Sequence, residues 1–197
     1  MRSKLSKVAY PDPPDGYETA VRFRYPIARL QIAAITNFIA AAILFTRVAH
    51  WLNSDIAITV SAADKFPDII VILISLVAIV IIHEAVHGVT YRLMGYHVSY
   101  GISWQMGAAY AAAFAQWQKR NHNLIAAVAP LLVLTPLLIA LLALPHHKLN
   151  LAAYVALIFN TGGAAGDLYL AWRLLKMPPK ALLYDLNPQI MLIYLPS

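Results

Sequence analysis

Apolar residues run along the chain in four long blocks that are separated by short polar stretches. The blocks cover residues 27–52, 69–94, 124–144 and 151–175. An α-helix rises 1.5 Å per residue, so a block of roughly 20 residues is long enough to cross the hydrocarbon core of a bilayer. The pattern predicts an integral membrane protein, mainly α-helical, with four transmembrane helices in a single polytopic domain that covers residues 1–197.

Two polar stretches outside these blocks alternate with a period of two, which is typical of β-strands. Residues 17–25 predict a short strand at the membrane surface. Between blocks two and three, the segment from Tyr96 to Gln105 also alternates, and Met106-Gly107 can turn the chain. The alanine-rich return that follows suits either a second strand or an interfacial helix. The prediction is therefore a short β-hairpin-like connection between helices 2 and 3.

The second block contains the chain's most unusual polar residues. Its uninterrupted run, IIVILISLVAIVII, ends at Ile82. Fourteen residues make only about 21 Å of helix, which is too short for a bilayer core of about 30 Å. The helix must therefore continue through HEAVHGVT towards Arg92, and Gly95 then provides a C-terminal stop. Polar side chains of this segment are expected inside the membrane, in its cytoplasmic third.

Composition and charge support a membrane protein. The chain is 60% hydrophobic and 12% charged, which is too apolar for the surface of a soluble domain of this size. Twelve basic residues flank the blocks on one predicted side: Arg2, Lys4, Lys7, Arg22, Arg24, Arg29, Arg92, Lys119, Arg120, Arg173, Lys176 and Lys180. The other side has Arg47, Lys65 and Lys148. The positive-inside rule then predicts a multi-pass protein whose N- and C-termini are cytoplasmic, as is the hairpin-like connection at residues 95–123 between helices 2 and 3.

Other classes of protein and chemistry are disfavoured. No basic cluster is interleaved with stacking aromatic residues, so a nucleic-acid partner is not expected. The chain has no cysteine, which removes disulfides and thiolate chemistry. The N-terminal segment lacks the apolar core and cleavage site of a signal peptide, so the first span should remain in the mature protein.

The candidate chemistry lies in the HEAVHG segment. His83 and His87 are four residues apart, so they project from one face of a helix and can bind one metal ion. Glu84 occupies the position of a general base in the HExxH arrangement. Ionisable groups inside a bilayer cost about 3 kcal/mol or more each, so they are functional candidates by default. Structural polar packing is the alternative, but it leaves the second histidine and the glutamate unexplained.

A catalytic zinc site uses a third protein ligand and an open position. Asp167 is the other acid inside the predicted spans. Spans two and four run in the same direction, and a basic residue ends each of them five or six residues after His87 and Asp167 respectively. The two positions are therefore expected at the same depth. The glycine-rich NTGGAAGD segment around Asp167 also predicts a broken helix or a cavity lining.

These features resemble a known family. HEAVHG, a β-prone connection, a further span, and an Asn and an Asp in a glycine-rich span are similar to the site-2 protease clan of intramembrane zinc metalloproteases. The segments PPDGYE and GDLYLAWRLLKMP more closely resemble small membrane proteins described as putative zincin peptidases. The resemblance covers most of residues 14–185. It implies His83, His87 and Asp167 as zinc ligands and Glu84 as the catalytic base.

The sequence departs from the clan in the second motif, where glycines replace a proline and Leu168 follows the aspartate. Glycine can supply the same break in the backbone, so Asp167 remains the expected ligand. The resemblance also implies that Asn160 holds the substrate backbone. A hairpin in this position is thought to receive the substrate as an added strand in that clan, so Tyr100 and Ile102 are expected substrate-binding residues.

The sequence therefore predicts an intramembrane zinc metalloprotease that hydrolyses peptide bonds in or near the bilayer. Its expected cofactor is Zn²⁺, and its expected partners are the lipid bilayer and a membrane-protein or peptide substrate. The first alternative is a non-enzymatic membrane protein that binds metal or clients through the same fold. A transporter with an ion site at the bilayer midplane is disfavoured, because the chain has four spans and no internal repeat. The sequence determines neither the substrate nor the oligomeric state.

Overall fold

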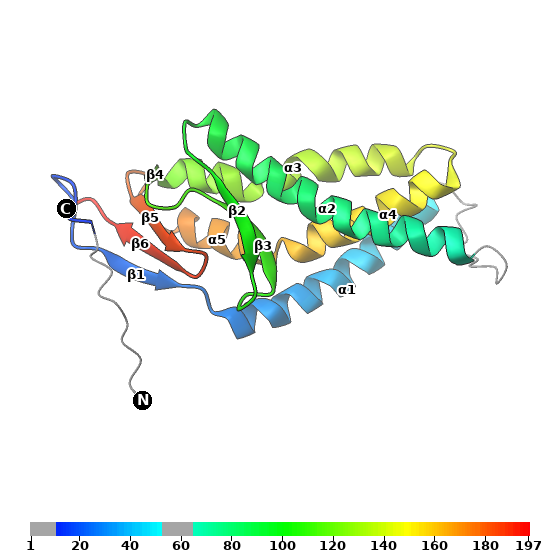
Figure 1. Ribbon diagram of the computed structural model, residues 1–197, viewed down its shortest axis with the longest axis horizontal. Helices are drawn as coiled ribbons and strands as arrows, with labels where there is room; N and C mark the ends of the chain where they lie inside the picture. The colour runs from blue at the N-terminus through cyan, green and yellow to red at the C-terminus, as the bar shows by residue number, and fades with distance from the viewer. Residues whose placement is uncertain (1–10, 53–64) are drawn as a thin grey trace.

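The computed structural model of the protein describes residues 11–52 and 65–197, and this part of the chain is mainly helical. Its helices are α1 (Ile27–Leu52), α2 (Lys65–Leu93), α3 (Arg120–Leu142), α4 (His147–Gly163) and α5 (Ala165–Leu175) (Figure 1). Of these, α1, α2 and α3 are long and apolar enough to cross a membrane. The count rises to four if α4 and α5, which meet at a bend of 43°, form one broken span.

The helices follow the predicted blocks, with differences at their ends. Helix α1 has the predicted bounds, whereas α2 and α3 each begin four residues earlier than their apolar blocks. The fourth block is two helices, and they meet at Ala164 within the predicted glycine-rich interruption. Glycine is about 1 kcal/mol less favourable than alanine in a helix, which explains a break in this glycine-rich segment. The basic residues Arg2, Lys4 and Lys7, and the predicted absence of a signal peptide, concern residues 1–10, which lie outside the described residues.

The predicted hairpin between the second and third spans is confirmed. Strand β2 (Ser99–Ser103) pairs antiparallel with β3 (Ala108–Ala112), with Ser99 opposite Ala112. Gly107 in the turn has a φ of +65°, a conformation that glycine adopts without steric cost. The alanine-rich return is therefore a strand, and the alternative of an interfacial helix is wrong.

A second, four-stranded sheet is not predicted by the sequence patterns. Its strands are β1 (Val21–Arg24), β4 (Trp117–Lys119), β5 (Leu182–Asn187) and β6 (Ile190–Tyr194), in the order β1-β6-β5-β4. The strand predicted within residues 17–25 is confirmed as β1. Figure 1 shows this sheet at one end of the helices, beside α5, with the hairpin crossing towards the start of α1. The prediction of a single β element between helices 2 and 3 is thus incomplete.

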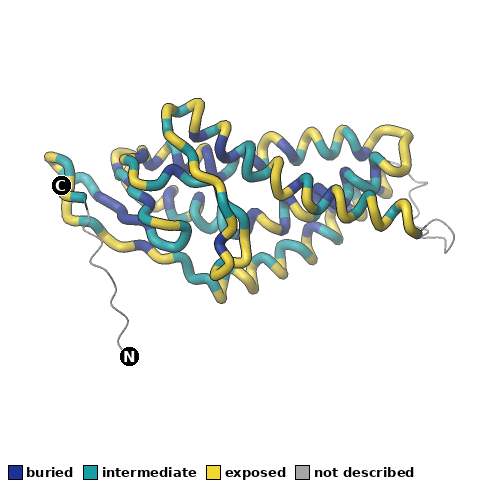
Figure 2. The backbone as a smooth tube through the Cα atoms, in the orientation of Figure 1, coloured by how far each residue is buried: buried dark blue, intermediate teal, exposed yellow. Residues whose placement is uncertain are grey.

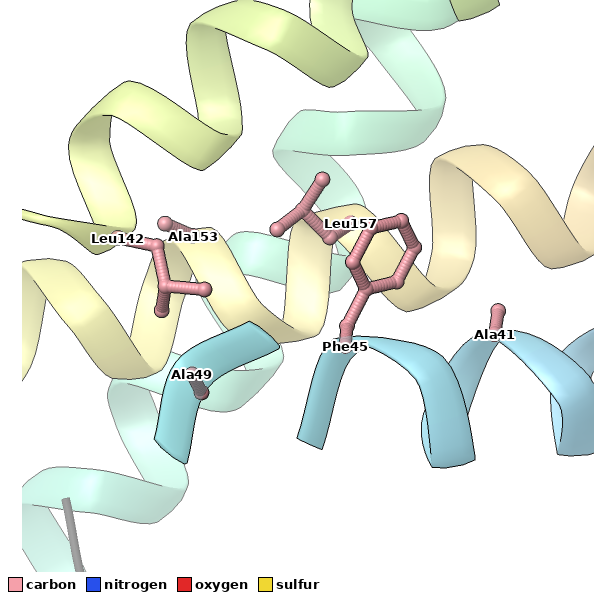
Figure 3. Close-up of a cluster of buried hydrophobic side chains, with 6 residues drawn as sticks. All are labelled: Ala41, Phe45, Ala49, Leu142, Ala153 and Leu157. Atoms are coloured by element: carbon pink, nitrogen blue, oxygen red, sulfur yellow. The ribbon is translucent and has the colours of Figure 1, made fainter. Parts of the chain in front are cut away.

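The helices pack around α4, which contacts α1, α2 and α3. One buried apolar cluster joins α1, α3 and α4 (Figure 3), and it consists of Ala41, Phe45, Ala49, Leu142, Ala153 and Leu157. Exposed positions run along much of α1 and α2 (Figure 2), and many of them are isoleucine, leucine or valine. Large apolar side chains on an outer surface suit contact with lipid. The arrangement leaves the C-terminal half of α2 beside the bend between α4 and α5.

Candidate metal centre

The HExxH segment and Asp167 come together where α2 passes the bend between α4 and α5. His83 and His87 lie one helical turn apart, and Asp167 lies in the first turn of α5. The Nε2 atoms of His83 and His87 lie 3.2 and 3.4 Å from Oδ2 of Asp167. Around a tetrahedral zinc ion with bonds near 2.1 Å, neighbouring ligand atoms are about 3.4 Å apart. The spacing of these atoms therefore suits a zinc ion.

The Nδ1 atom of each imidazole ring, on the side away from Asp167, makes a hydrogen bond. Nδ1–H of His83 donates to Oδ1 of Asn160 (3.0 Å), and Nδ1–H of His87 donates to the backbone oxygen of Ala126 (2.8 Å). When Nδ1 carries the proton, the lone pair of Nε2 is free to bind a metal, and hydrogen bonds of this kind usually orient metal-binding histidines. Both rings thus direct a free lone pair towards Asp167. This observation supports the donor set independently of the interatomic distances.

Asn160 is buried and has two partners. Its Nδ2 donates to Oγ1 of Thr135 (3.2 Å) while its Oδ1 accepts from His83. The bond to Thr135 ties the amide on α4 to α3 beside the metal centre. The sequence suggested a substrate-binding role for Asn160, whereas its contacts favour a role in orienting His83.

A cavity of about 720 Å³ opens beside these residues. His83, Glu84, His87 and Asp167 line it, as do residues of α1, β3, α4 and the turn between β5 and β6. The backbone N–H of Ala111 in β3 faces the Glu84 carboxylate. Glu84 therefore lines the same cavity as the three candidate ligands and lies beside the hairpin.

The hairpin residues expected to bind substrate lie elsewhere. Tyr100 packs on α2 over Gly88, with the Arg92 guanidinium 5.5 Å from the centre of its ring. Neither Tyr100 nor Ile102 is among the described residues that line the cavity, whereas all of β3 lines it. The structure therefore favours β3 over Tyr100 and Ile102 as the part of the hairpin that faces a bound substrate.

One further polar residue of the cavity was not predicted. Asp185 in β5 is buried, and its Oδ2 accepts a hydrogen bond from Nε2 of Gln118 (3.1 Å). Burial raises the pKa of the Asp185 carboxyl to about 6, and the bond from Gln118 opposes this rise. Asp185 lies outside the apolar blocks, and a lone aspartate in a short strand carries no motif that could have identified it.

Comparison with known proteins gives a family. Residues 76–182, more than half of the chain, match the sequence model of a family described as "Putative zincin peptidase". A relative from Pyrococcus woesei, named "Uncharacterized 24.7 kDa protein in gap 5'region", is 28% identical over 116 residues, which are 58% of this chain. The match covers 50% of the relative, so the chain spans about half of that protein's length. No solved structure matches.

Proposed function

The chain belongs to the putative zincin peptidase family, and on this basis we propose that it is a zinc metalloprotease that hydrolyses peptide bonds in or near the bilayer. The observation that carries the proposal is the convergence of two Nε2 atoms and one carboxylate oxygen beside a cavity that Glu84 also lines. A site that only binds metal needs no carboxylate in that position. The long apolar helices around the cavity support a location within the membrane.

His83, His87 and Asp167 would hold the zinc ion. When bound there, zinc supplies a Lewis acid that polarises the scissile carbonyl and makes a water molecule easier to deprotonate. Three protein ligands leave an open position, which is the arrangement of catalytic rather than structural zinc sites. The hydrogen bonds from the two histidines to Asn160 and Ala126 keep the rings in place while substrates bind and leave.

Glu84 acts as the general base. It accepts a proton from the attacking water and then passes that proton to the nitrogen of the leaving amine. The carboxylate lies on the cavity side of α2, where the N–H of Ala111 faces it. Proton transfer by a positioned side chain of this kind contributes roughly 10²–10⁴-fold to a rate.

Strand β3 supplies an edge for an extended substrate. Ala111 directs its N–H towards Glu84 and away from β2, so Ala109, two residues earlier, points its backbone groups the same way. These groups lie at the cavity, where a substrate segment can pair with them as an additional strand. Pairing of this kind requires an unwound substrate, which also exposes a peptide bond that a transmembrane helix keeps within its own hydrogen-bonded structure.

Side-by-side measurements of zinc content and peptide cleavage test the proposal. Glu84→Gln removes the base but no proposed ligand, so the variant should keep about one zinc per chain while cleavage falls by about 100-fold or more. His83→Ala should lose zinc and cleavage together. His50→Ala changes an exposed histidine on α1 and should leave both measurements unchanged.

Each outcome has a definite meaning. Cleavage by Glu84→Gln at the wild-type rate would refute the proposed base. Wild-type protein that lacks metal after purification without a chelator would refute the zinc site. Zinc-loaded wild-type protein that cuts none of a library of membrane-spanning peptides would favour the non-enzymatic alternative, in which the same site binds metal or clients.

A further inference from the structure

A second charged position lines the same cavity. Asp185 of β5 is only 8% exposed, and its Oδ2 accepts from Gln118. Within residues 11–52 and 65–197, its other oxygen, Oδ1, has no hydrogen-bond donor. The residue lines the cavity, so this oxygen is available to a bound molecule.

A chain of buried side chains fixes the carboxylate. Nε2 of Gln118 donates to the Ala113 carbonyl (2.7 Å) as well as to Asp185, and Oε1 of Gln118 accepts from Asn123 (2.9 Å). Asn123 in turn accepts from the hydroxyl of Tyr91 on α2 (2.9 Å). Gln118 and Asn123 are fully buried, so strand β5 is tied to β4, α3 and α2 by bonds that exclude water. Asp185 is therefore held in place before any ligand binds.

The charges around the cavity do not balance. The acidic residues that line it are Glu84, Asp167 and Asp185, and no lysine or arginine lies among the described lining residues. Asp167 and Glu84 lie at the candidate metal centre, where a divalent ion would offset their charge, whereas Asp185 has no positively charged partner among the described residues. A buried carboxylate is costly unless a positive group or hydrogen bonds compensate it. The compensating charge is thus expected from whatever occupies the cavity.

We propose that Asp185 determines specificity by binding a lysine or arginine side chain of the substrate. This inference rests on the proposed function, since it concerns the substrate of that same cavity. Membrane proteins carry an excess of Lys and Arg in the segments that flank their spans on the cytoplasmic side. Asp185 follows the last span and so lies on the side that the charge distribution predicts to be cytoplasmic. A basic residue beside a substrate's span and the Asp185 carboxylate would then meet at one depth.

Binding to matched peptides tests the proposal without requiring cleavage. The probes are single-span peptides with acetylated N-termini and neutral flanks, so their single Lys is their only cation. Lys is placed at each flank position in turn, and a matched set carries Gln. Full-length, zinc-loaded Glu84→Gln protein in lipid nanodiscs should bind one Lys peptide at least tenfold more tightly than its Gln counterpart, measured by fluorescence anisotropy.

Further substitutions in the Glu84→Gln protein test whether the preference for Lys peptides depends on the Asp185 carboxylate. Asp185→Asn should reduce the tenfold preference to less than twofold, and Asp185→Glu, which keeps the charge, should retain most of it. Glu18→Gln is the matched control, because Glu18 is exposed, lies near the same sheet and does not line the cavity. It should keep the full preference. Thermal unfolding of each variant establishes that the protein is folded.

The outcomes separate this inference from the proposed function. Equal binding of Lys and Gln peptides, or an unchanged preference in Asp185→Asn, overturns the role of Asp185. The same peptides are also incubated with protein that retains Glu84. A Lys preference without any cleavage would favour the non-enzymatic alternative to the peptidase and would leave the basic-residue site standing. Cleavage without a Lys preference would support the peptidase and refute the role of Asp185 in binding a basic residue.

Discussion

The ring nitrogens that face away from Asp167 determine how well the two histidines can serve as ligands. Oδ1 of Asn160 accepts a hydrogen bond from His83, and the Ala126 carbonyl accepts one from His87. The first of these acceptors is a side chain and can be removed by mutation, whereas the second belongs to the backbone. Asn160 therefore offers the more direct test of how far the surrounding hydrogen bonds support the metal centre.

Replacing Asn160 with alanine should weaken zinc binding without abolishing it. Loss of a hydrogen bond to a metal-binding histidine typically costs 10–100-fold in metal affinity. Competition with a zinc chelator, followed by metal analysis, measures the change. Asn150→Ala is the control, because Asn150 is also a buried asparagine of α4 but lies at the helix start, away from the site. Equal zinc affinity in Asn160→Ala and wild type would contradict the orienting role.

Asp185 should make stability depend on pH. Its pKa is about 6 in the folded protein against an ordinary value of 3.8, so between pH 4 and 6 the folded state binds more protons than the unfolded state. Stability then falls as pH rises through this range, and ionised Asp185 costs about 3 kcal/mol at neutral pH. Asp185→Asn removes this cost.

The melting temperatures of wild type and Asp185→Asn, compared from pH 4 to pH 7, measure the effect. The advantage of the variant should grow with pH and reach about 5 °C or more at pH 7. Glu18→Gln should show no such trend relative to wild type. A difference between Asp185→Asn and wild type that is the same at every pH would mean that Asp185 ionises as it does in the unfolded chain.

At the scale of elements, the bend between α4 and α5 places Asp167 opposite α2, and α1 packs close beside it. Phe38 of α1 lies directly on Gly162, so closely that a Cβ at this glycine would overlap the ring. Phe38 also meets Phe159 edge to face, with ring centres 5.0 Å apart. Both aromatic rings line the cavity. The position of α1 therefore depends on the absence of a side chain at Gly162.

Gly162→Ala should destabilise the protein by about 1–3 kcal/mol, because Phe38 has to move to admit the methyl group. The adjacent Gly163→Ala is the matched control, since no atom outside its immediate chain neighbours and helix backbone lies within 4 Å of a Cβ there. It should be neutral or slightly stabilising, because alanine favours helix by about 1 kcal/mol over glycine. Thermal unfolding of both variants provides the comparison. Equal changes in stability for the two variants would show that Phe38 can move aside without cost.

The elements were predictable to different degrees for physical reasons. Helix length and apolarity identify the long helices, and alternation identifies β1 and β2. Strand β6 is buried along nearly its whole length, so it appears as a short apolar run that periodicity cannot assign. Its partner β1 lies near the other end of the described chain, and no local signal predicts such a pairing.

Some parts of the candidate site could be predicted from the sequence and others could not. The spacing of His83 and His87 and the matched depth of Asp167 predict that these residues meet, and the structure brings them together. The hydrogen bond from His87 to Ala126 could not be predicted, because a backbone carbonyl has no sequence signature. The cavity side of the hairpin was also not predictable, because it depends on which edge of the two strands packs towards α2.

At the scale of the whole molecule, orientation in the membrane follows from the predicted distribution of basic residues. The chain has no cysteine, so single cysteines can be introduced without background labelling. Lys148→Cys should react with a membrane-impermeant maleimide on intact cells, whereas Lys180→Cys should react only after lysis. Both side chains are exposed, so accessibility to the reagent depends on the membrane side alone. The opposite labelling pattern would reverse the proposed topology.

The pairing of β1 with β6 has a consequence for biosynthesis. Roughly 170 residues separate these partners along the chain, and β6 also contributes Met191 to the wall of the cavity. Ribosomes add about 5–20 residues per second, so β1 waits roughly 10–30 s for its partner. Within that interval Glu84 and the two histidines are translated first, and Asp167 follows only near its end. The cavity around the candidate metal centre is therefore enclosed only after β6 has been translated.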